Sequence, residues 1–565
     1  MKFAAKFGAR CVVTLMVGGV VIGVPLSDAL DPVSAASTRS AGAKPLGTTT
    51  YPVPVGAIFV SSAGNDSASG SQTAPLKTIG RAITAAPHGG TVVIRGGVYR
   101  ESLTISNERL TLQPYPNEAV IIRGSRTLSS FIAVGGDWRR DGWNYQFPRQ
   151  APETVAANYP MANAPDMVFY DGQPLRQVSK LSQVSGKAFF VDYTTSQLFI
   201  GIDPVGHVLE GSYLQTALML NNADNSIVRG LQFERFATPV NTHGAVVDLS
   251  DDVTFEHNIF VDNASSGLSL RGNRTVVAGN TFGFNGQLGL HAFQTDGAVI
   301  EDNKINNNNT ERFDQFQEAG GAKLVQSVNV QFAGNYVLNN IGNGIWFDID
   351  SDHAVIVRNE AFSNNRNGIQ FEISDGAIIA GNTVRSNTDV GIHIIESTNI
   401  DVYNNVVYKN DVALTVWDGS RPHLVGNIAI RNNVLMDARA TSTALLDVDD
   451  KTHTLSGAEM GVTADYNAYC RSVAGTPSRV VDWSRSNTTQ ANYNSVSAFR
   501  AGTGNETHGL ACEATVATGF FVKASTGNFA LSTSSVGRGA GGALPANVAA
   551  ALGVTAGVAV DVGLL

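Results

Sequence analysis

The chain has 565 residues, a net charge of −9 and 43% hydrophobic residues, and its basic residues are dispersed along the sequence. The sequence has no basic stripe of the kind that binds nucleic acid, so nucleic acid is not an expected partner. Gly is abundant, with 58 residues, and Asn is enriched in the middle of the chain. Both biases indicate many tight turns rather than helices.

The first 36 residues have the order of a secretory signal peptide. A basic start, an apolar run and a small-residue cleavage site follow one another: Lys2, Lys6 and Arg10, then 11–26, then Ser34, Ala35 and Ala36. An uncleaved membrane anchor is the alternative, but so short a run, broken by Pro25, falls below the ~20 residues of a span. We therefore expect cleavage, a linker over 37–56, and a secreted protein with no membrane span.

Cysteine usage agrees with export. Cys11 lies in the signal peptide, so the mature chain keeps Cys470 and Cys512. An even pair in an exported protein predicts one disulfide, with two buried free thiols as the alternative. Two cysteines alone do not form a zinc site, so no thiolate metal site is expected.

The segments after the linker change character twice. Residues 76–86 have an amphipathic helical pattern and are expected to cap the open end of a solenoid, with 57–124 forming the cap and first coils. Residues 125–215 follow no repeat and hold strand-like pieces rich in aromatic residues, which predicts an inserted β-sandwich-like module. Residues 441–565 lose the repeat again and are expected to form a C-terminal cap and tail.

The middle of the chain repeats an Asn-containing phrase. Its Asn residues are Asn258, Asn280, Asn303, Asn335, Asn359, Asn382, Asn405 and Asn433. Most intervals are 22 to 24 residues, which suits three short strands and three turns and is too short for two helices. Asn tolerates the left-handed region at a sharp corner, and stacked Asn side chains bond one another. The pattern predicts an all-β fold, a parallel β-helix over 216–440.

A recurrent Gly sets the register of one strand in each coil. The series is Gly267, Gly289, Gly344, Gly368 and Gly391, with Gly244 and Gly321 placed in the same column. Strand side chains alternate, so the residues two and four positions after each Gly point outward. The first outward column is Val246, Ser269, His291, Lys323, Trp346, Gln370, His393 and Thr415. The second is Asp248, Arg271, Phe293, Val325, Asp348, Glu372, Ile395 and Trp417.

The phrases APLKTIGRAI at 74–83 and GGTVVIRGGVYRE at 89–101, with the Asn ladder, resemble the pectate-lyase-like right-handed β-helix superfamily. The resemblance covers about 57–124 and 216–440 and implies the fold. It leaves the activity open, because this fold hosts lyases, hydrolases, epimerases and adhesins. The inserted module makes the chain similar to β-xylosidase-type glycosidases of family 120, which implies an Asp and a Glu on successive coils.

Asp348 and Glu372 are the candidate catalytic pair. They hold equivalent places on consecutive coils, and adjacent strands lie ~4.8 Å apart. That spacing matches the ~5–5.5 Å between the carboxyls of retaining glycosidases. We assign Asp348 as the nucleophile and Glu372 as the acid/base, with the reversed roles as the alternative.

Residues around the pair are candidate sugar contacts. The 32-residue interval of the ladder places an expanded turn next to the Asp348 face, and such loops commonly carry binding residues. The candidates are Glu318, Lys323, Trp346, His291, Gln370, His393, Asp350 and Trp417, with Trp138 and Trp143 of the module as a second wall. No cofactor is required. Calcium at the DIDSD run is the weaker alternative, because the run lacks the Gly and terminal Glu of an EF-hand loop.

The leading functional hypothesis is a retaining glycoside hydrolase whose partner is a polysaccharide or oligosaccharide. A polysaccharide lyase or uronate C5-epimerase is the alternative, with Lys323, His291 or His393 as the base. A non-catalytic carbohydrate-binding or adhesion solenoid is the third hypothesis. The absence of a basic groove in the sequence pattern disfavours uronate chemistry.

Overall fold

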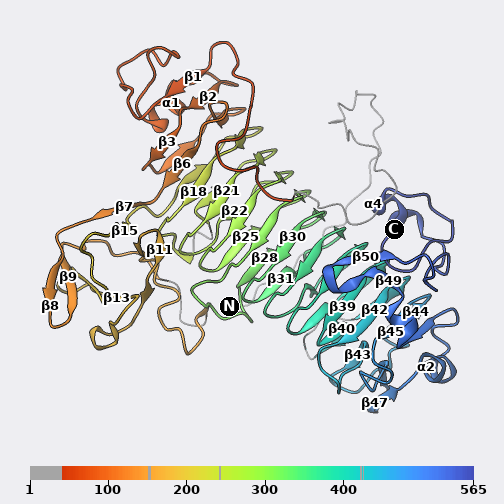
Figure 1. The fold of residues 1–565 in the computed structure, drawn as a ribbon. Helices are drawn as coiled ribbons and strands as arrows, with labels where there is room; N and C mark the ends of the chain where they lie inside the picture. The colour runs from red at the N-terminus through yellow and green to blue at the C-terminus, as the bar shows by residue number, and fades with distance from the viewer. Residues whose placement is uncertain (1–40, 150–153, 241–243, 420, 422, 424) are drawn as a thin grey trace, which may run out of the picture.

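The computed structural model describes residues 41–149, 154–240, 244–419, 421, 423 and 425–565 (Figure 1). The predicted signal peptide lies outside these residues. The described part is mostly β-structure, dominated by three long parallel sheets that wind along one axis as a solenoid. Within the described residues, no helix is long and apolar enough to cross a membrane.

Each sheet of the solenoid takes one strand from every coil, and the second sheet ends in an additional strand, β47(Thr488–Tyr493), that pairs antiparallel to its neighbour. The first sheet contains β1(Ile58–Val60), β2(Thr91–Ile94), β5(Thr111–Pro114), β17(Ile227–Arg229), β20(Thr254–Glu256), β23(Val276–Ala278), β26(Val299–Glu301), β29(Gln331–Ala333), β32(Ala354–Val357), β35(Asp375–Ala380), β38(Thr398–Tyr403), β41(Gly426–Arg431) and β44(Val462–Asp465). The second sheet contains β4(Leu103–Ile105), β16(Leu218–Leu220), β19(Val246–Asp248), β22(Leu268–Leu270), β25(Leu288–Phe293), β28(Gly320–Val325), β31(Asn343–Asp348), β34(Ile369–Glu372), β37(Val390–Ile395), β40(Val412–Asp418), β43(Leu446–Asp450), β46(Val481–Arg485) and β47(Thr488–Tyr493). The third sheet contains β3(Gly97–Tyr99), β6(Val120–Arg123), β18(Gln232–Glu234), β21(Ile259–Val261), β24(Thr281–Gly283), β27(Lys304–Asn306), β30(Tyr336–Leu338), β33(Glu360–Phe362), β36(Thr383–Arg385), β39(Val406–Asn410), β42(Val434–Ala438), β45(Ala468–Arg471) and β48(Leu510–Glu513).

Inward side chains of the three sheets form one continuous apolar core. Like residues stack from coil to coil, as with Phe260 and Phe282, whose ring centroids lie 4.8 Å apart. Parallel strands buried in this way gain their stability from the apolar area removed from water, about 25 cal/mol per Å². The core fixes the register, because a slip by one residue would turn every inward side chain outward.

The predicted Asn ladder occupies one corner of successive coils. Asn335 Nδ2 donates to Asn359 Oδ1 at 3.1 Å, and Asn359 Nδ2 donates to Asn382 Oδ1 at 3.1 Å. A second ladder, which the sequence analysis missed, follows the first by five residues, at Asn263, Asn285, Asn308, Asn340, Asn364, Asn387 and Asn410. The two ladders flank the third-sheet strand of each coil, so buried amides satisfy the backbone at both of its ends.

The N-terminal end carries the predicted capping helix. Helix α1(Ile79–Ala85) begins at Thr78, whose hydroxyl accepts a hydrogen bond from the Arg81 N–H. Such an N-cap satisfies one of the free N–H groups of the first turn. The helix packs its buried face, with Ile79, Ala82 and Ile83, against β1, β2 and β4.

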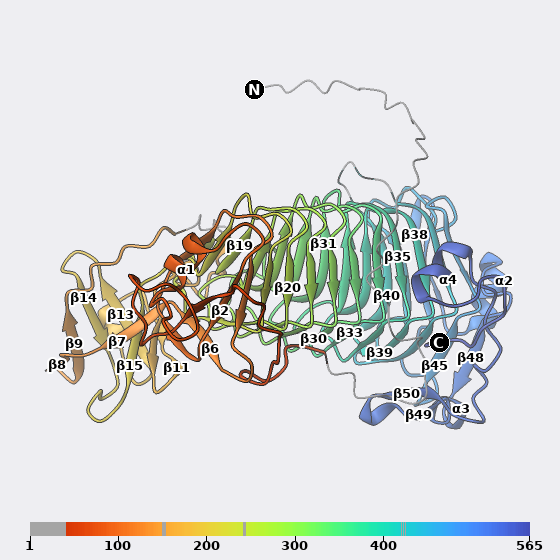
Figure 2. The same ribbon diagram turned by 90° about the horizontal axis from the view of Figure 1, so that it is seen from above.

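The inserted module folds as two small antiparallel sheets. One contains β7(Ser125–Leu128), β10(Val168–Tyr170), β11(Gln173–Pro174) and β15(Leu209–Ser212). The other contains β8(Ile132–Val134), β9(Asp137–Asp141), β12(Arg176–Gln177), β13(Ala188–Asp192) and β14(Gln197–Ile200), with β12 pairing parallel to β13. A 3-10 turn lies at Leu181–Gln183. The module sits at the N-terminal end of the solenoid, away from its centre (Figure 2).

The solenoid extends beyond residue 440, further than the sequence repeat indicated. The strands β43 to β46 and β48 continue the three sheets, and Asn467 extends the first Asn ladder by one more coil, although the coils lengthen. Cys470 and Cys512 face each other on the paired strands β45 and β48 and form a disulfide. Helix α2(Val496–Thr503) packs on β47 at this end. Helix α3(Thr515–Thr518) and the hairpin β49(Phe521–Lys523)–β50(Asn528–Leu531), with a 3-10 turn at Ala524–Thr526, lie against the third sheet, and α4(Ala546–Leu552) packs against β32 and β35 of the first sheet.

Candidate functional site

The outer face of the second sheet carries the predicted columns, with one correction. Strand pairing aligns His291, Lys323, Trp346, Gln370 and His393 as one row. At the first coils the alignment is shifted by one residue. Val247, not Val246, pairs with Ser269, and Asp248 pairs with the inward Leu270. Ala245 therefore takes the column place expected for Gly244, and Asp248 belongs to the interior.

Asp348 and Glu372 are register partners on β31 and β34. They are 6% and 8% exposed, so both carboxyls lie in a largely water-excluded part of the face. Burial raises the pKa of Asp348, as does the charge of Glu372, whereas the Lys323 ammonium lowers it; the net direction is upward. The sequence therefore placed the two carboxyls on neighbouring strands correctly.

Lys323 is the centre of the contacts around Asp348. Its Nζ lies 2.9 Å from Asp348 Oδ2 and donates to the Gln317 carbonyl at 2.8 Å. The same ammonium lies 3.7 Å from the centroid of the Trp346 ring, a cation–π contact. Trp346 points outward as expected, but it is only 5% exposed. The expected flat face for a sugar is covered by Lys323.

Glu372 accepts hydrogen bonds from three side chains. Trp346 Nε1 donates to Oε2 at 3.2 Å, Gln370 Nε2 donates to the same oxygen, and Arg421 Nη1 donates to Oε1 at 2.7 Å. Gln370 is itself held by Asn343 and Asn367, which donate to its Oε1. Gln370, expected to bind substrate, instead orients Glu372.

The two histidines of the row are buried. His291 on β25 is the register partner of Lys323 on β28, and His393 contacts the Thr415 hydroxyl through Nδ1. Burial lowers the pKa of His393 to about 3, with Arg366 and Lys451 adding to the effect, so its ring is neutral at physiological pH. Its ring meets Trp417 edge-to-face with centroids 4.6 Å apart. In this arrangement the histidines support the face rather than reach into solvent.

The expanded turn between β27 and β28 lies against the site, as predicted. Besides the Gln317 contact with Lys323, the Gln315 carbonyl accepts a hydrogen bond from Arg366 at 3.1 Å. Phe313 packs with Val240 and Ala319 and forms a bridge with Val155, so a loop of the inserted segment, between β9 and β10, supports the turn. The expanded turn is therefore held in place both at Phe313 and at Gln315 and Gln317.

Other predicted residues lie at the margin of the site or outside it. Glu318 is half-buried at the end of the expanded turn. Asp350 is exposed in the turn after β31, with φ of 51°, rather than on the strand face. Trp143 is buried inside the module, where Nε1 donates to Asp166, and Trp138 packs on the same core. Both tryptophans therefore belong to the core of the module, and β9, which carries Trp138, lies far from β31 (Figure 1), so they form no second wall.

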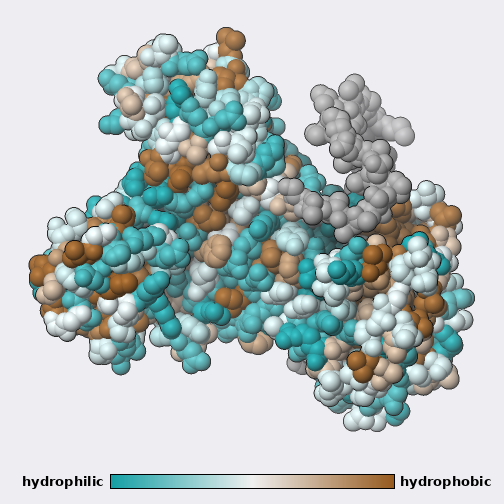
Figure 3. Space-filling model, in the orientation of Figure 1, coloured by the Kyte–Doolittle hydropathy of each residue, from teal (hydrophilic) through white to brown (hydrophobic). Residues whose placement is uncertain are grey.

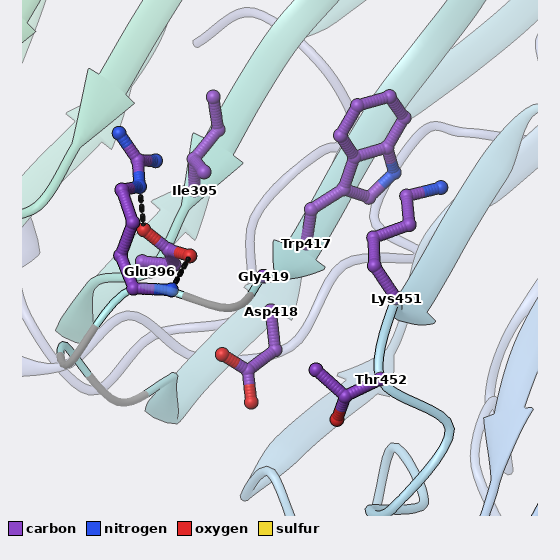
Figure 4. Close-up of a pocket in the computed structure, with 8 residues that line it drawn as sticks. Ile395, Glu396, Trp417, Asp418, Gly419, Lys451 and Thr452 are labelled. Atoms are coloured by element: carbon purple, nitrogen blue, oxygen red, sulfur yellow. Dashed lines mark hydrogen bonds and ion pairs between the residues drawn. The ribbon is translucent and has the colours of Figure 1, made fainter.

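A cavity of about 460 Å³ opens on the same face, towards the C-terminal end from Glu372 (Figure 4). Its lining includes Glu396, Trp417, Asp418, Arg421, Lys451 and Thr452. Arg421 pairs with both Glu372 and Glu396, and therefore joins the carboxyl pair to the cavity. Lys451 Nζ lies 3.9 Å from the Trp417 ring centroid and 2.5 Å from Asp449 Oδ2.

Sequence reasoning found Trp417 but missed its charged neighbours. Arg421, Lys451 and Glu396 come from turns that follow strands, where no repeat sets the direction of a side chain. Asp449 continues the column of Trp417 on β43, but Leu445 stands where the recurrent Gly would mark the register of this coil. The pairing of strands is the signal that reveals it.

In the part of the chain that the structure describes, no group of three or more His, Cys, Asp or Glu side chains is arranged to hold a metal ion. The DIDSD run shows why, because Asp348 lies on the strand face while Asp350 lies in the exposed turn.

The surface in Figure 3 mixes hydrophilic and apolar residues along the solenoid, as expected for a face that contacts water.

Comparisons with family models address the solenoid and its first coils. A model described as a right-handed beta helix region matches residues 216–370 and 277–435. A model for a protein family of unknown function matches residues 62–112. No curated protein sequence matches significantly.

Solved structures share the architecture at low sequence identity. The structure of XylC with xylose is 17% identical, covers 73% of this chain and 83% of its own, and gives a TM-score of 0.60. Pectate lyase Pel9A is 14% identical, with 92% and 96% coverage and a TM-score of 0.43. The A-module of the Azotobacter vinelandii mannuronan C-5 epimerase AlgE6 is 12% identical, with 69% and 88% coverage and a TM-score of 0.43. The structural neighbours include glycoside hydrolases, lyases and epimerases that act on carbohydrates, and the likeness shows that the chain has the right-handed β-helix fold.

Proposed function

We propose that the chain is a retaining glycoside hydrolase that acts on oligosaccharide or polysaccharide. The observation that carries the proposal is the pairing of Asp348 with Glu372 at equivalent positions of adjacent strands. Neighbouring strands lie ~4.8 Å apart, close to the ~5–5.5 Å between the two carboxyls of retaining enzymes and below the ~6.5–9.5 Å of inverting ones. The likeness to a structure that contains xylose supports a sugar ligand.

In the proposed reaction Asp348 attacks the anomeric carbon while Glu372 protonates the oxygen of the leaving group. The glycosidic bond breaks and a glycosyl ester forms on Asp348. Glu372 then takes a proton from water, whose oxygen attacks the anomeric carbon and releases the sugar with retained configuration. Lys323 supports the charge of Asp348, because it opposes the effect of burial on the pKa of that carboxyl.

The reversed assignment, with Glu372 as the nucleophile and Asp348 as the acid/base, also has physical support. Glu372 accepts hydrogen bonds from Trp346, Gln370 and Arg421, and these donors hold the carboxyl in one orientation, as an attacking nucleophile requires. Burial raises the pKa of Asp348, as expected for a proton donor. A nucleophile and an acid respond differently to substitution, so one experiment separates the two assignments.

The test uses aryl glycosides and uronate polymers, each assayed with and without EDTA, on wild type, Asp348→Asn and Glu372→Gln. We expect hydrolysis with retained anomeric configuration, and proton NMR of the first product measures that configuration. Asp348→Asn should be folded and inactive on every substrate. Glu372→Gln should still react with substrates that have good leaving groups, and azide should trap the sugar in that variant. Trapping in the Asp348 variant instead would reverse the roles.

The control is Asp296→Asn, which removes an exposed carboxylate in a turn of the solenoid and should retain activity. Inversion at the anomeric carbon would exclude the double displacement. An unsaturated uronate product, whose formation is lost with EDTA, would replace this proposal with a lyase.

We also propose that the protein is exported, because residues 1–36 have the order of a signal peptide. N-terminal sequencing of the mature protein tests this proposal.

A further inference from the structure

The cavity beside Arg421 is aligned with the carboxyl pair rather than separate from it. Strand pairing places Glu372, Ile395 and Trp417 in one outward column on β34, β37 and β40. Trp417 is therefore two strands from Glu372, about 10 Å along the solenoid axis. Ile395 lies between them and also lines the cavity.

The lining of the cavity has the chemistry of a sugar site. Lys451 Nζ lies 3.9 Å from the ring centroid of Trp417, but this indole is half-buried, unlike Trp346, and so still presents part of its surface to the cavity. Thr452 and Asp418 supply a hydroxyl and a carboxylate beside it (Figure 4). A sugar ring combines an apolar face with hydroxyls at its edge, so an indole surrounded by polar groups complements it. A few polar groups around an apolar surface are typical of small-molecule sites.

The charges of the cavity favour an uncharged sugar. Each cation that lines it is already paired: Arg421 with Glu372 and Glu396, and Lys451 with Asp449. A uronate carboxylate would have to compete with these carboxylates for the same cations. The adjacent carboxylates would repel it, at a cost that grows as water is excluded.

We propose that this cavity is a distal sugar subsite, and that a neutral oligosaccharide lies along the solenoid axis from Asp348 and Glu372 to Trp417. The chain then spans at least three consecutive sugar units, with the middle one over Ile395. Arg421 connects the catalytic pair with the subsite, because its guanidinium contacts Glu372 on one side and Glu396 on the other. This inference rests on the proposed function for the direction of the chain.

The experiment measures binding, not turnover. Xylotriose, xylose and trigalacturonate are titrated by calorimetry into the Asp348→Asn protein. We expect xylotriose to bind about tenfold or more tightly than xylose, and trigalacturonate to bind more weakly than xylotriose. Adding Trp417→Ala should weaken xylotriose binding about tenfold, the size expected from losing one aromatic contact.

The xylose affinity should stay unchanged in the Trp417→Ala protein, because a single sugar occupies the end near Asp348. Trp417→Phe keeps a ring against His393 and should recover part of the affinity, which separates loss of the subsite from misfolding. Phe284→Ala, which removes an exposed aromatic ring from a turn of another part of the solenoid, is the matched control and should bind as the parent does.

Equal binding of xylose and xylotriose, failure of xylotriose to bind, or tighter binding of trigalacturonate would each overturn the subsite proposal. Its failure is distinguishable from failure of the proposed function. Retaining hydrolysis without dependence on chain length would remove the subsite and keep the hydrolase. Binding that depends on Trp417 without any hydrolysis by wild type would keep the subsite and remove the hydrolase.

Discussion

Lys323 and Asp348 form a buried ion pair on the outer face of the second sheet, with 2.9 Å between Nζ and Oδ2. Removing one partner of such a pair leaves the other charge buried without compensation, which commonly costs ~3–5 kcal/mol. The pair also links the expanded turn to the carboxyls, because the same ammonium holds the Gln317 carbonyl. The stability of the face and, in the proposed function, catalysis therefore both depend on the Lys323 side chain.

Lys323→Met should move the acidic limb of the activity profile to higher pH. The ammonium lowers the pKa of Asp348, so its loss raises that pKa further, and a nucleophile must be ionised to react. We expect a shift of about one pH unit or more. The measurement is kcat/KM for an aryl glycoside against pH. Lys180→Met, on the surface of the module, should leave the profile in place; an unshifted limb in Lys323→Met would refute the role of the pair.

Asp248→Asn should stabilise the protein at neutral and alkaline pH. Burial raises the pKa of Asp248 to about 7, above the ~3.9 of an unfolded chain. The native state therefore binds the extra proton between these values, and the stability that this gives is lost as pH rises through about 7. Asn keeps the neighbours Thr275 and Ser250 bonded without the charge.

For this variant we expect a gain on the order of 1–3 kcal/mol at pH 8 and little change at pH 4. Denaturant unfolding at both pH values measures it. Asp296→Asn, an exposed carboxylate, serves as the comparison and should give no such pH-dependent gain. Destabilisation by Asp248→Asn at pH 8 would show that the carboxylate is needed in its charged form.

Asn335→Ala should strongly destabilise the solenoid. The Asn335 amide accepts from the N–H and Nδ2 of Asn303 and donates to the Ile300 carbonyl and to Asn359, all inside the molecule. Each buried group left without a partner costs ~1–3 kcal/mol. Asn365→Ala, an exposed Asn one residue beyond the second ladder, should change the free energy of unfolding by less than about 0.5 kcal/mol. Equal effects of the two substitutions would contradict the ladder.

The Cys470–Cys512 disulfide should protect the C-terminal coils. It closes a loop of 42 residues between paired strands, and loops of this size gain about 3–4 kcal/mol from the bond in the chain-entropy account. We expect no free thiol in the denatured, unreduced mature protein. The double substitution Cys470→Ala, Cys512→Ala should speed proteolysis near this end while the central coils stay protected in hydrogen exchange.

The sequence predicted the fold and the carboxyl pair because both follow from a repeat. The spacing of Gly344 and Gly368 placed Asp348 and Glu372 on neighbouring strands, and the pairing agrees. The same reasoning failed at Gly244, because strand pairing sets Val246 opposite Leu268, so that Ala245 takes the column place. The contacts of Arg421 and Glu372 join residues 49 apart through a turn, and no periodic signal encodes such a contact.

The covering of Trp346 shows a second limit of the sequence. Alternation gives the direction in which Trp346 points, but not what lies over it. The Lys323 side chain comes from the neighbouring strand and reaches across the ring, which a column of residue types does not reveal. Direction is a local property, whereas exposure depends on side chains from several coils.

The 32-residue step between Asn303 and Asn335 shows how this architecture separates tolerance from precision. The extra residues leave the solenoid at one corner, and both ladders continue across the step without a break. A corner can therefore gain or lose chain while the strands on either side keep their pairing. The strands of the outer face therefore keep their chemical groups at a fixed spacing, and a corner is a place where inserted residues cost little, because loop-closure entropy grows slowly with length.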